Sequence, residues 1–256
     1  MSELIADLKR SRIEKLLASG KRLDGRHLEE PRELRIEKGL VKTAEGSARV
    51  HLGKTDVLVG VKISIGTPYP DTPNSGVLTT SVELVPMASP TFETGPPRPD
   101  SVELARVVDR GIRESKTINM DKMCIVPGEK VWMLYLDIHA LDYDGNLFDA
   151  ASYGAVAALT SAILPASKIA EVDRPLPVDH IPVSVTCAKI GDVIVVDPAL
   201  AEEGIADARL TVTTDENGDI RAMQKGLNGS FSYDEVKRVI GLSQKVGRQI
   251  RETIVR

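Results

Sequence analysis

The order of hydrophobic and polar positions along the 256-residue chain predicts a mixture of helices and strands. Residues 2–19 repeat apolar side chains at helical spacing and stop at Gly20, which indicates an amphipathic helix. Short alternating or apolar runs follow, separated by glycine and turn residues. They predict a meander of three strands at 33–41, 47–53 and 56–65.

The middle of the chain alternates proline-rich connections with regular elements. Residues 77–86 predict a fourth strand, and residues 102–115 predict a helix that Asp100 or Ser101 caps. Residues 122–145 predict two further strands, of which the second is unusually apolar and therefore central in its sheet. The next helix is dense in alanine, glycine and serine, which indicates close burial against a sheet.

The last part of the chain repeats the theme of strands followed by a helix. Residues 181–197 predict two strands, and residues 208–225 predict a hairpin in which Asn217-Gly218 favours a type I′ turn. The closing helix starts with a Ser232-x-x-Glu235 capping box. The fold class is therefore α+β, with helices packed on mixed sheets. We divide the chain into an N-terminal helix (1–20), a first half (21–170) and a second half (171–256).

Composition narrows the functional classes. The chain is 42% hydrophobic, enough for a sizeable core, but no apolar run approaches the ~18–20 residues that a membrane span needs. We expect no membrane partner and a cytoplasmic protein. Cys124 and Cys187 lie far apart among apolar residues, so we expect buried thiols and no metal site. A net charge of −4 and 4% aromatic residues count against a general nucleic-acid binder. An anion site would be local, or shared with another chain.

One helix carries a row of cations. Arg106, Arg110 and Arg113 fall within roughly 60° of one another on the polar side of the predicted helix. They could form a solvated face, with Glu103 paired to Arg106 and Asp109 to Arg113. However, Arg106 and Arg110 repel each other at i,i+4, and arginine suits bidentate anion binding. The pattern alone leaves both interpretations open.

Several segments in a specific order resemble the RNase PH family. They are "RLDGR" (22–26), "AEGSARVHLGKTDVLVGV" (44–61), "VELARVVDRGIR" (102–113) and "LDYDGNLFDAASYGAVAAL" (141–159). The likeness covers roughly residues 20 to 250. It implies the RNase PH-like fold of two βαβ-type halves, which is ribosomal protein S5 domain 2-like. Active members are phosphorolytic 3′ exoribonucleases, in which inorganic phosphate attacks the 3′-terminal phosphodiester.

The resemblance also implies that the phosphate site is degenerate. Active members have Gly-Thr-Arg or Gly-Ser-Arg at the start of the second helix, where the arginine binds phosphate. The matching positions here are Asn146, Leu147 and Phe148, followed by Asp149. Phenylalanine replaces the phosphate-binding arginine and Asp149 adds negative charge, so we expect no phosphate binding at Leu147 and Phe148.

The acidic site of the family is altered as well. Active members have a pair of aspartates here, and the matching residues are Glu203 and Arg209. We therefore expect no catalytic residues. Asp197, Glu202, Glu203 and Asp207 still form an acidic cluster. We interpret it as a solvated loop and not as a metal site, because no histidine or second tight carboxylate pair accompanies it.

The arginine row, by contrast, matches arginines that line the RNA or phosphate path of active members. We therefore expect Arg106 and Arg110 to bind RNA, and Arg113 with less support. Arg22 and Arg26 could meet a partner chain or water.

The resemblance is greatest to the non-catalytic RNase PH-like subunit of the archaeal exosome. It implies a hexameric ring of three heterodimers with a catalytic RNase PH-like subunit, RNA-binding cap subunits, and single-stranded RNA as a partner. The chain would need no cofactor, because the catalytic partner would use phosphate and Mg²⁺. Two alternatives are a self-sufficient phosphorolytic 3′ exoribonuclease and a purely structural ring subunit without RNA contact.

Overall fold

The computed structural model describes the backbone of residues 2–255 and the side chains of residues 10–255. The helices are α1 (Ser2–Ala18), α2 (Pro99–Glu114), α3 (Leu147–Thr160), α4 (Leu200–Glu203) and α5 (Tyr233–Val255), with 3₁₀ turns η1 (Met120–Met123) and η2 (Ala166–Ile169). The strands are β1 (Leu34–Lys38), β2 (Gly46–Leu52), β3 (Thr55–Gly66), β4 (Val77–Leu84), β5 (Cys124–Val126), β6 (Lys130–Asp142), β7 (Ile163–Leu164), β8 (Arg174–Pro175), β9 (Val183–Ile190), β10 (Val193–Val196), β11 (Ala208–Thr214) and β12 (Ile220–Gly226).

The first half is built on a six-stranded sheet with the order β1-β2-β3-β6-β4, to which β5 adds at one end of β6. The first three strands form the predicted antiparallel meander. β4 runs parallel to β6, and α2 lies in the connection between them. The apolar strand β6 lies between two neighbours, so its predicted central position is confirmed.

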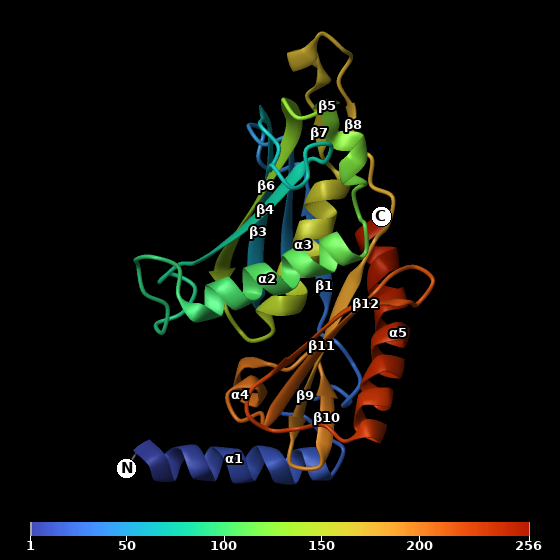
Figure 1. Cartoon of the computed structure of the whole chain (residues 1–256). Helices are drawn as coiled ribbons and strands as arrows, with labels where there is room; N and C mark the ends of the chain where they lie inside the picture. The colour runs from blue at the N-terminus through green and yellow to red at the C-terminus, as the bar shows by residue number, and fades with distance from the viewer. Residues whose placement is uncertain (1, 256) are drawn as a thin grey trace.

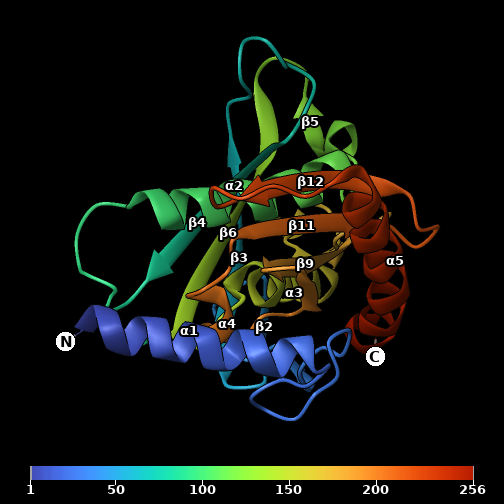
Figure 2. The same ribbon diagram turned by 90° about the horizontal axis from the view of Figure 1, so that it is seen from below.

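The second half is a four-stranded antiparallel sheet with the order β10-β9-β11-β12. Figures 1 and 2 show α5 along one side of this sheet and α1 across its lower end. The predicted hairpin is confirmed, but its type I′ turn is wrong. A type I′ turn needs positive φ at both central residues, and only Gly218 has it. The loop is instead organised by the Asp215 carboxylate, which accepts hydrogen bonds from the backbone N–H groups of Asn217 and Asp219.

Helix α3 lies between the two sheets and is buried from Leu147 to Leu159. Small residues permit this close contact: a Cβ added at Gly154 would lie 2.7 Å from Val59 Cγ2. The buried-helix prediction is confirmed. One continuous core joins both sheets, and a smaller cluster packs Ile13 and Leu17 of α1 against β9 and β10.

The helix starts give one correction and one confirmation. α2 begins at Pro99 with Arg98 as its N-cap, so the predicted caps Asp100 and Ser101 lie inside the first turn. Proline fixes φ at a helical value and lacks the N–H that a cap would satisfy, which explains the earlier start. The capping box of α5 is confirmed, with Ser232 N donating to Glu235 Oε2 at 2.6 Å and Glu235 N to Ser232 Oγ at 3.3 Å.

Three further expectations concern the chain as a whole. Cys187 is buried as predicted, whereas Cys124 is only partly buried. Within residues 2–255 no helix is both long and apolar enough to cross a bilayer. The division at residues 20/21 and 170/171 stays a prediction, and its first and last residues lie outside the described chain.

Candidate functional site

The start of α3 is held tightly against α4. Gly145 has φ +90°, and a Cβ there would lie 2.5 Å from the backbone nitrogen of Leu200. Only glycine tolerates both that conformation and that approach. The next residue, Asn146, is the N-cap in a left-handed conformation. This packing brings Phe148 on α3 beside Glu203 on α4 and Arg209 on β11. The residues at the predicted phosphate and acid positions therefore form one cluster.

Glu203 fills the anion position at the start of α3. Its Oε2 accepts hydrogen bonds from the backbone N–H of Asn146 at 2.8 Å and from the Tyr143 hydroxyl at 3.2 Å. Burial, with the nearby charge of Glu203, raises the pKa of Tyr143, so its hydroxyl stays a donor. The start of a helix carries partial positive charge and can bind a phosphate. In this chain the Glu203 carboxylate neutralises that charge.

Arg209 is enclosed beside it. Its guanidinium carbon lies 3.9 Å from the centre of the Phe148 ring, and a Cβ added at Gly226 would lie 2.6 Å from its Nη2. The same Nη2 donates to Glu103 Oε1 at 2.8 Å, and Nη1 lies 3.8 Å from Glu203 Oε1. Arg209 is only 8% exposed. The Arg209 guanidinium is therefore neutralised by two carboxylates of the chain and covered by an aromatic ring, so it is poorly placed to bind a phosphate.

A cavity of about 190 Å³ opens beside these residues. Asp100, Glu103 and Glu203 line it, and Arg209 is the one cation among its lining residues. A phosphate entering here would meet three carboxylates and one guanidinium that is already paired, so Coulomb repulsion disfavours it. Phe148, Glu203 and Arg209 thus fill the space beside the start of α3 with one another. The degeneration of the phosphate and acid positions stays a prediction.

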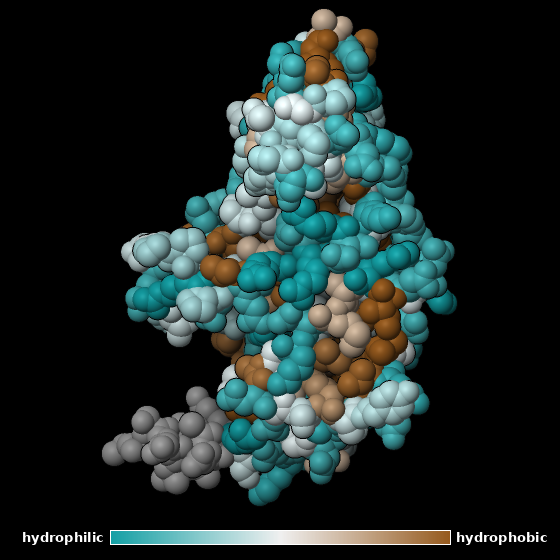
Figure 3. Space-filling view, in the orientation of Figure 1, coloured by the Kyte–Doolittle hydropathy of each residue, from teal (hydrophilic) through white to brown (hydrophobic). Residues whose placement is uncertain are grey.

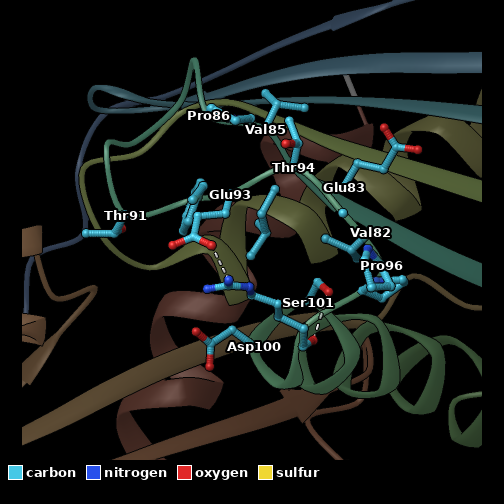
Figure 4. Close-up of a pocket in the computed structure, with 15 residues that line it drawn as sticks. Val82, Glu83, Val85, Pro86, Thr91, Glu93, Thr94, Pro96, Asp100 and Ser101 are labelled. Carbon is cyan, nitrogen blue, oxygen red and sulfur yellow. Dashed lines mark hydrogen bonds and ion pairs between the residues drawn. The ribbon is translucent and has the colours of Figure 1, made fainter.

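A second cavity of about 350 Å³ adjoins the first between the loop after β4 and the start of α2. Figure 4 shows Glu93 and Thr94 on the loop and Asp100 and Ser101 on α2 around the same hollow. Its one lining cation, Arg98, is ion-paired with Glu93. This hollow also lacks an unpaired positive group among its described lining residues.

Behind the start of α3 lies a buried polar network. Arg32 donates to both oxygens of Asp197, at 2.9 and 2.7 Å, and Asn146 Nδ2 donates to Asp197 at 2.7 Å and to Asp149 at 2.8 Å. Burial raises the pKa of Asp149 to about 7, although Asn146 and Thr186 donate to it. Burial also disfavours a charged Asp197, but hydrogen bonds from Arg32 prevail and hold its pKa below the ordinary value. The network joins β9 of the second sheet to the first half.

The interpretation of the acidic cluster as a solvated loop is wrong for two of its four members, Asp197 and Glu202. Asp197 and Glu202 are 1% and 2% exposed. Arg22, itself buried, donates to Glu202 at 2.8 Å, and Arg26 lies 3.2 Å from Asp197. These arginines therefore bind within the chain, and neither lies free for a partner or water. Within residues 10–255 no group of three or more His, Cys, Asp or Glu side chains is placed to hold a metal ion.

The three arginines of α2 differ in their surroundings. Arg113 binds the carboxylate of Asp109 and the carbonyl of Leu78, each at 3.1 Å. Arg110 is half-buried and donates to Gln224 Oε1 at 2.9 Å. Arg106 is exposed and has no hydrogen bond or ion pair with any side chain of residues 10–255.

The pairs expected for a solvated face are only half present. Asp109 and Arg113 are paired as predicted, but Glu103 binds Arg209 and not Arg106. Figure 3 shows a hydrophilic band across the front of the molecule where α2 lies. Arg106 and Arg110 thus stay the cations of this face that no carboxylate among residues 10–255 neutralises.

Comparisons with known proteins agree with this architecture. The model of the 3′ exoribonuclease family matches residues 30–165 with its domain 1 and residues 180–246 with its domain 2. The chain is similar to "Exosome complex component Rrp42" of Thermoplasma volcanium, with 53% identity over 100% of this chain and 98% of the relative.

Solved structures give the same result. A chain of the Archaeoglobus fulgidus exosome with RNA bound to the active site superposes with a TM-score of 0.94 at 46% identity, covering 97% of this chain and 98% of that one. A chain of an archaeal exosome core superposes with a TM-score of 0.91 at 41% identity over 100% of both chains. The RNase PH-like fold is confirmed, and the chain belongs to the 3′ exoribonuclease, or RNase PH, family.

Proposed function

We propose that this chain is a non-catalytic subunit of an exosome core ring that contacts RNA during 3′-to-5′ phosphorolytic degradation. One observation carries the proposal. Glu203 and Arg209 fill the start of α3, while Arg106 on the neighbouring helix has no internal partner within residues 10–255. The chain has therefore lost the place for phosphate and kept cations that can hold an RNA backbone.

The similarity to proteins named Rrp42, which are exosome components, supports the assembly. In this proposal the chain forms a hexameric ring of three heterodimers with the catalytic RNase PH-like subunit, whose active site it supports. Cap subunits with RNA-binding domains complete the complex in the cytoplasm. The catalytic partner uses phosphate and Mg²⁺, and this chain needs neither.

The RNA contact rests on Arg106 and Arg110. A guanidinium without a carboxylate partner can take up a phosphate in bidentate geometry without first breaking an ion pair. Arg113 contributes less, because Asp109 already neutralises it. Contacts to phosphates position a strand without reading its bases, so sequence specificity at these residues is slight.

The test is RNA binding by the assembled ring with Arg106→Ala and Arg110→Ala together. We expect affinity for single-stranded RNA to fall about tenfold near 50 mM salt, and the slope of log K against log salt to become shallower by about one. Arg35→Ala is the matched control, because Arg35 is exposed and, among residues 10–255, is paired with Glu33 alone. Equal affinities of the double variant and the parent at two salt concentrations would favour a purely structural subunit.

The enzymatic alternative has its own assay. The isolated chain is incubated with single-stranded RNA, phosphate and Mg²⁺, and released nucleoside diphosphates are measured. We expect none from a folded sample. Release that disappears without phosphate, from protein free of contaminating nuclease, would identify a self-sufficient phosphorolytic exoribonuclease.

A further inference from the structure

Glu103 lies three residues before Arg106 on α2, at the spacing where an acid and a base on one helix attract each other. Its carboxylate nevertheless points away from that neighbour and accepts from Arg209 Nη2 at 2.8 Å. Arg209 lies on β11, 106 residues further along the chain. Arg209 thus binds the nearby carboxylate that could otherwise pair with Arg106 and compete with an RNA phosphate.

We propose that Arg209 is a positioning residue for RNA binding: it holds Glu103 so that Arg106 stays free to bind phosphate. The inference rests on the proposed function of Arg106. It gives a role to the arginine that stands where active relatives carry an acid. Arg209 itself touches no RNA in this proposal, since it is enclosed under Phe148.

The surroundings of Arg209 explain why it prevails over Arg106. The Arg209 side chain is 10% exposed and packs on the Phe148 ring, whereas the Glu103 side chain is 36% exposed. Water therefore screens this ion pair less than it would screen a pair between two fully exposed side chains. A pair between Glu103 and Arg106 would be solvent-exposed, where such pairs contribute only about 0.2–0.5 kcal/mol. Gly226 on β12 leaves room for the guanidinium, because a side chain there would collide with it.

A second polar contact joins α2 to the same sheet. Arg110 donates to Gln224 on β12, one strand beyond Arg209. The two contacts lie on either side of Arg106 along the helix. Polar contacts with the second half therefore help to orient α2, while its apolar face packs on β4 and α3 and also reaches the second sheet.

The test uses the assembled ring and three variants of this chain. Arg209→Ala should weaken binding of single-stranded RNA about twofold at low salt, because Glu103 becomes free to pair with Arg106 and to repel phosphates. Adding Glu103→Gln to Arg209→Ala should restore the parent affinity. In a chain that already carries Arg106→Ala, Arg209→Ala should have much less effect, since coupled residues are not additive.

The outcomes separate this inference from the proposed function. If Arg106→Ala leaves RNA affinity unchanged, the proposed function fails. If Arg106→Ala weakens binding but Arg209→Ala does not, or if Glu103→Gln fails to restore it, the inference on Arg209 is overturned. Arg174→Ala, which removes an exposed pair with Glu171, serves as the control for a lost arginine. Ring assembly is checked by molar mass for every variant.

Discussion

The start of α3 and the exposed face of α2 both hold arginines, yet they handle charge in opposite ways. Arg32 and Arg209, which surround the start of α3, are both largely buried and bound to carboxylates of the chain, Asp197 and Glu103 respectively. On α2, Arg106 is exposed, and among residues 10–255 the one side-chain partner of Arg110 is the amide of Gln224. Arg113 of the same helix is paired with Asp109. The contrast teaches that an arginine's capacity to bind a ligand is decided by its neighbours and its burial, and residue type alone does not reveal it.

The largest expected effect on stability comes from removing a buried arginine near the start of α3. Arg32→Ala should lower the free energy of unfolding by about 3–5 kcal/mol, because it leaves Asp197 buried with much of its compensating charge gone. Urea unfolding followed by circular dichroism measures this. Arg35→Ala, at an exposed pair, should change it by less than about 1 kcal/mol. Similar losses for both variants would erase the contrast between buried and exposed arginines.

An effect of up to similar size should appear in the pH dependence of stability. The pKa of Asp149 is raised to about 7, so the folded state favours its neutral form. Its contribution to stability is therefore complete below its ordinary pKa and is lost as the pH rises through 7. In the parent protein the free energy of unfolding should fall by about 4 kcal/mol between pH 4 and 8, and Asp149→Asn should remove this fall. Thermal unfolding across that range is the measurement, and parallel curves for parent and variant would contradict the assignment.

A third prediction compares two arginines of α2 that differ in whether a carboxylate is paired with them. In the assembled ring, Arg106→Ala should weaken RNA binding about fivefold, whereas Arg113→Ala should weaken it less than about twofold. Arg113 is already neutralised by Asp109, so its removal releases little favourable charge. Fluorescence anisotropy with labelled RNA distinguishes the two. Equal losses would show that an i,i+4 ion pair does not reduce phosphate binding.

The smallest expected effect is that of Phe148→Arg on phosphate binding, for which we expect no gain. Phe148→Arg restores the residue type expected at the phosphate position, but Glu203 still occupies the start of α3 and Arg209 still fills the space beside it. Calorimetry should therefore detect no phosphate binding by this variant at millimolar concentrations. A measurable affinity would mean that Phe148 alone excludes phosphate.

The sequence predicted elements well where the determining interactions are local. The meander, the hairpin and the buried helix α3 follow from alternation, turn residues and small side chains. The apolar face of α2 was equally visible. The turn type at Asn217-Gly218 failed because Asp215, outside the dipeptide, organises the loop.

The candidate site was harder to predict, because its decisive contacts join distant segments. Arg32 and Asp197 are 165 residues apart, and no local pattern distinguishes a buried pair from two exposed charges. Glu103 had a suitable partner at i,i+3, but the enclosed Arg209 binds it instead. Arg32 was missed altogether. A buried strand that ends in aspartate was the one available signal that a cation must lie nearby.

The filled start of α3 has an evolutionary consequence. Changing Arg209 alone would leave Glu103 without its partner, and changing Glu203 alone would leave the N–H of Asn146 without its acceptor. Each of these single substitutions thus leaves a buried or partly buried polar group without its partner, which lowers the stability of the protein. Under the proposed function, regaining a phosphate site would therefore require several substitutions at once, and a chain with this arrangement would depend on a catalytic partner subunit.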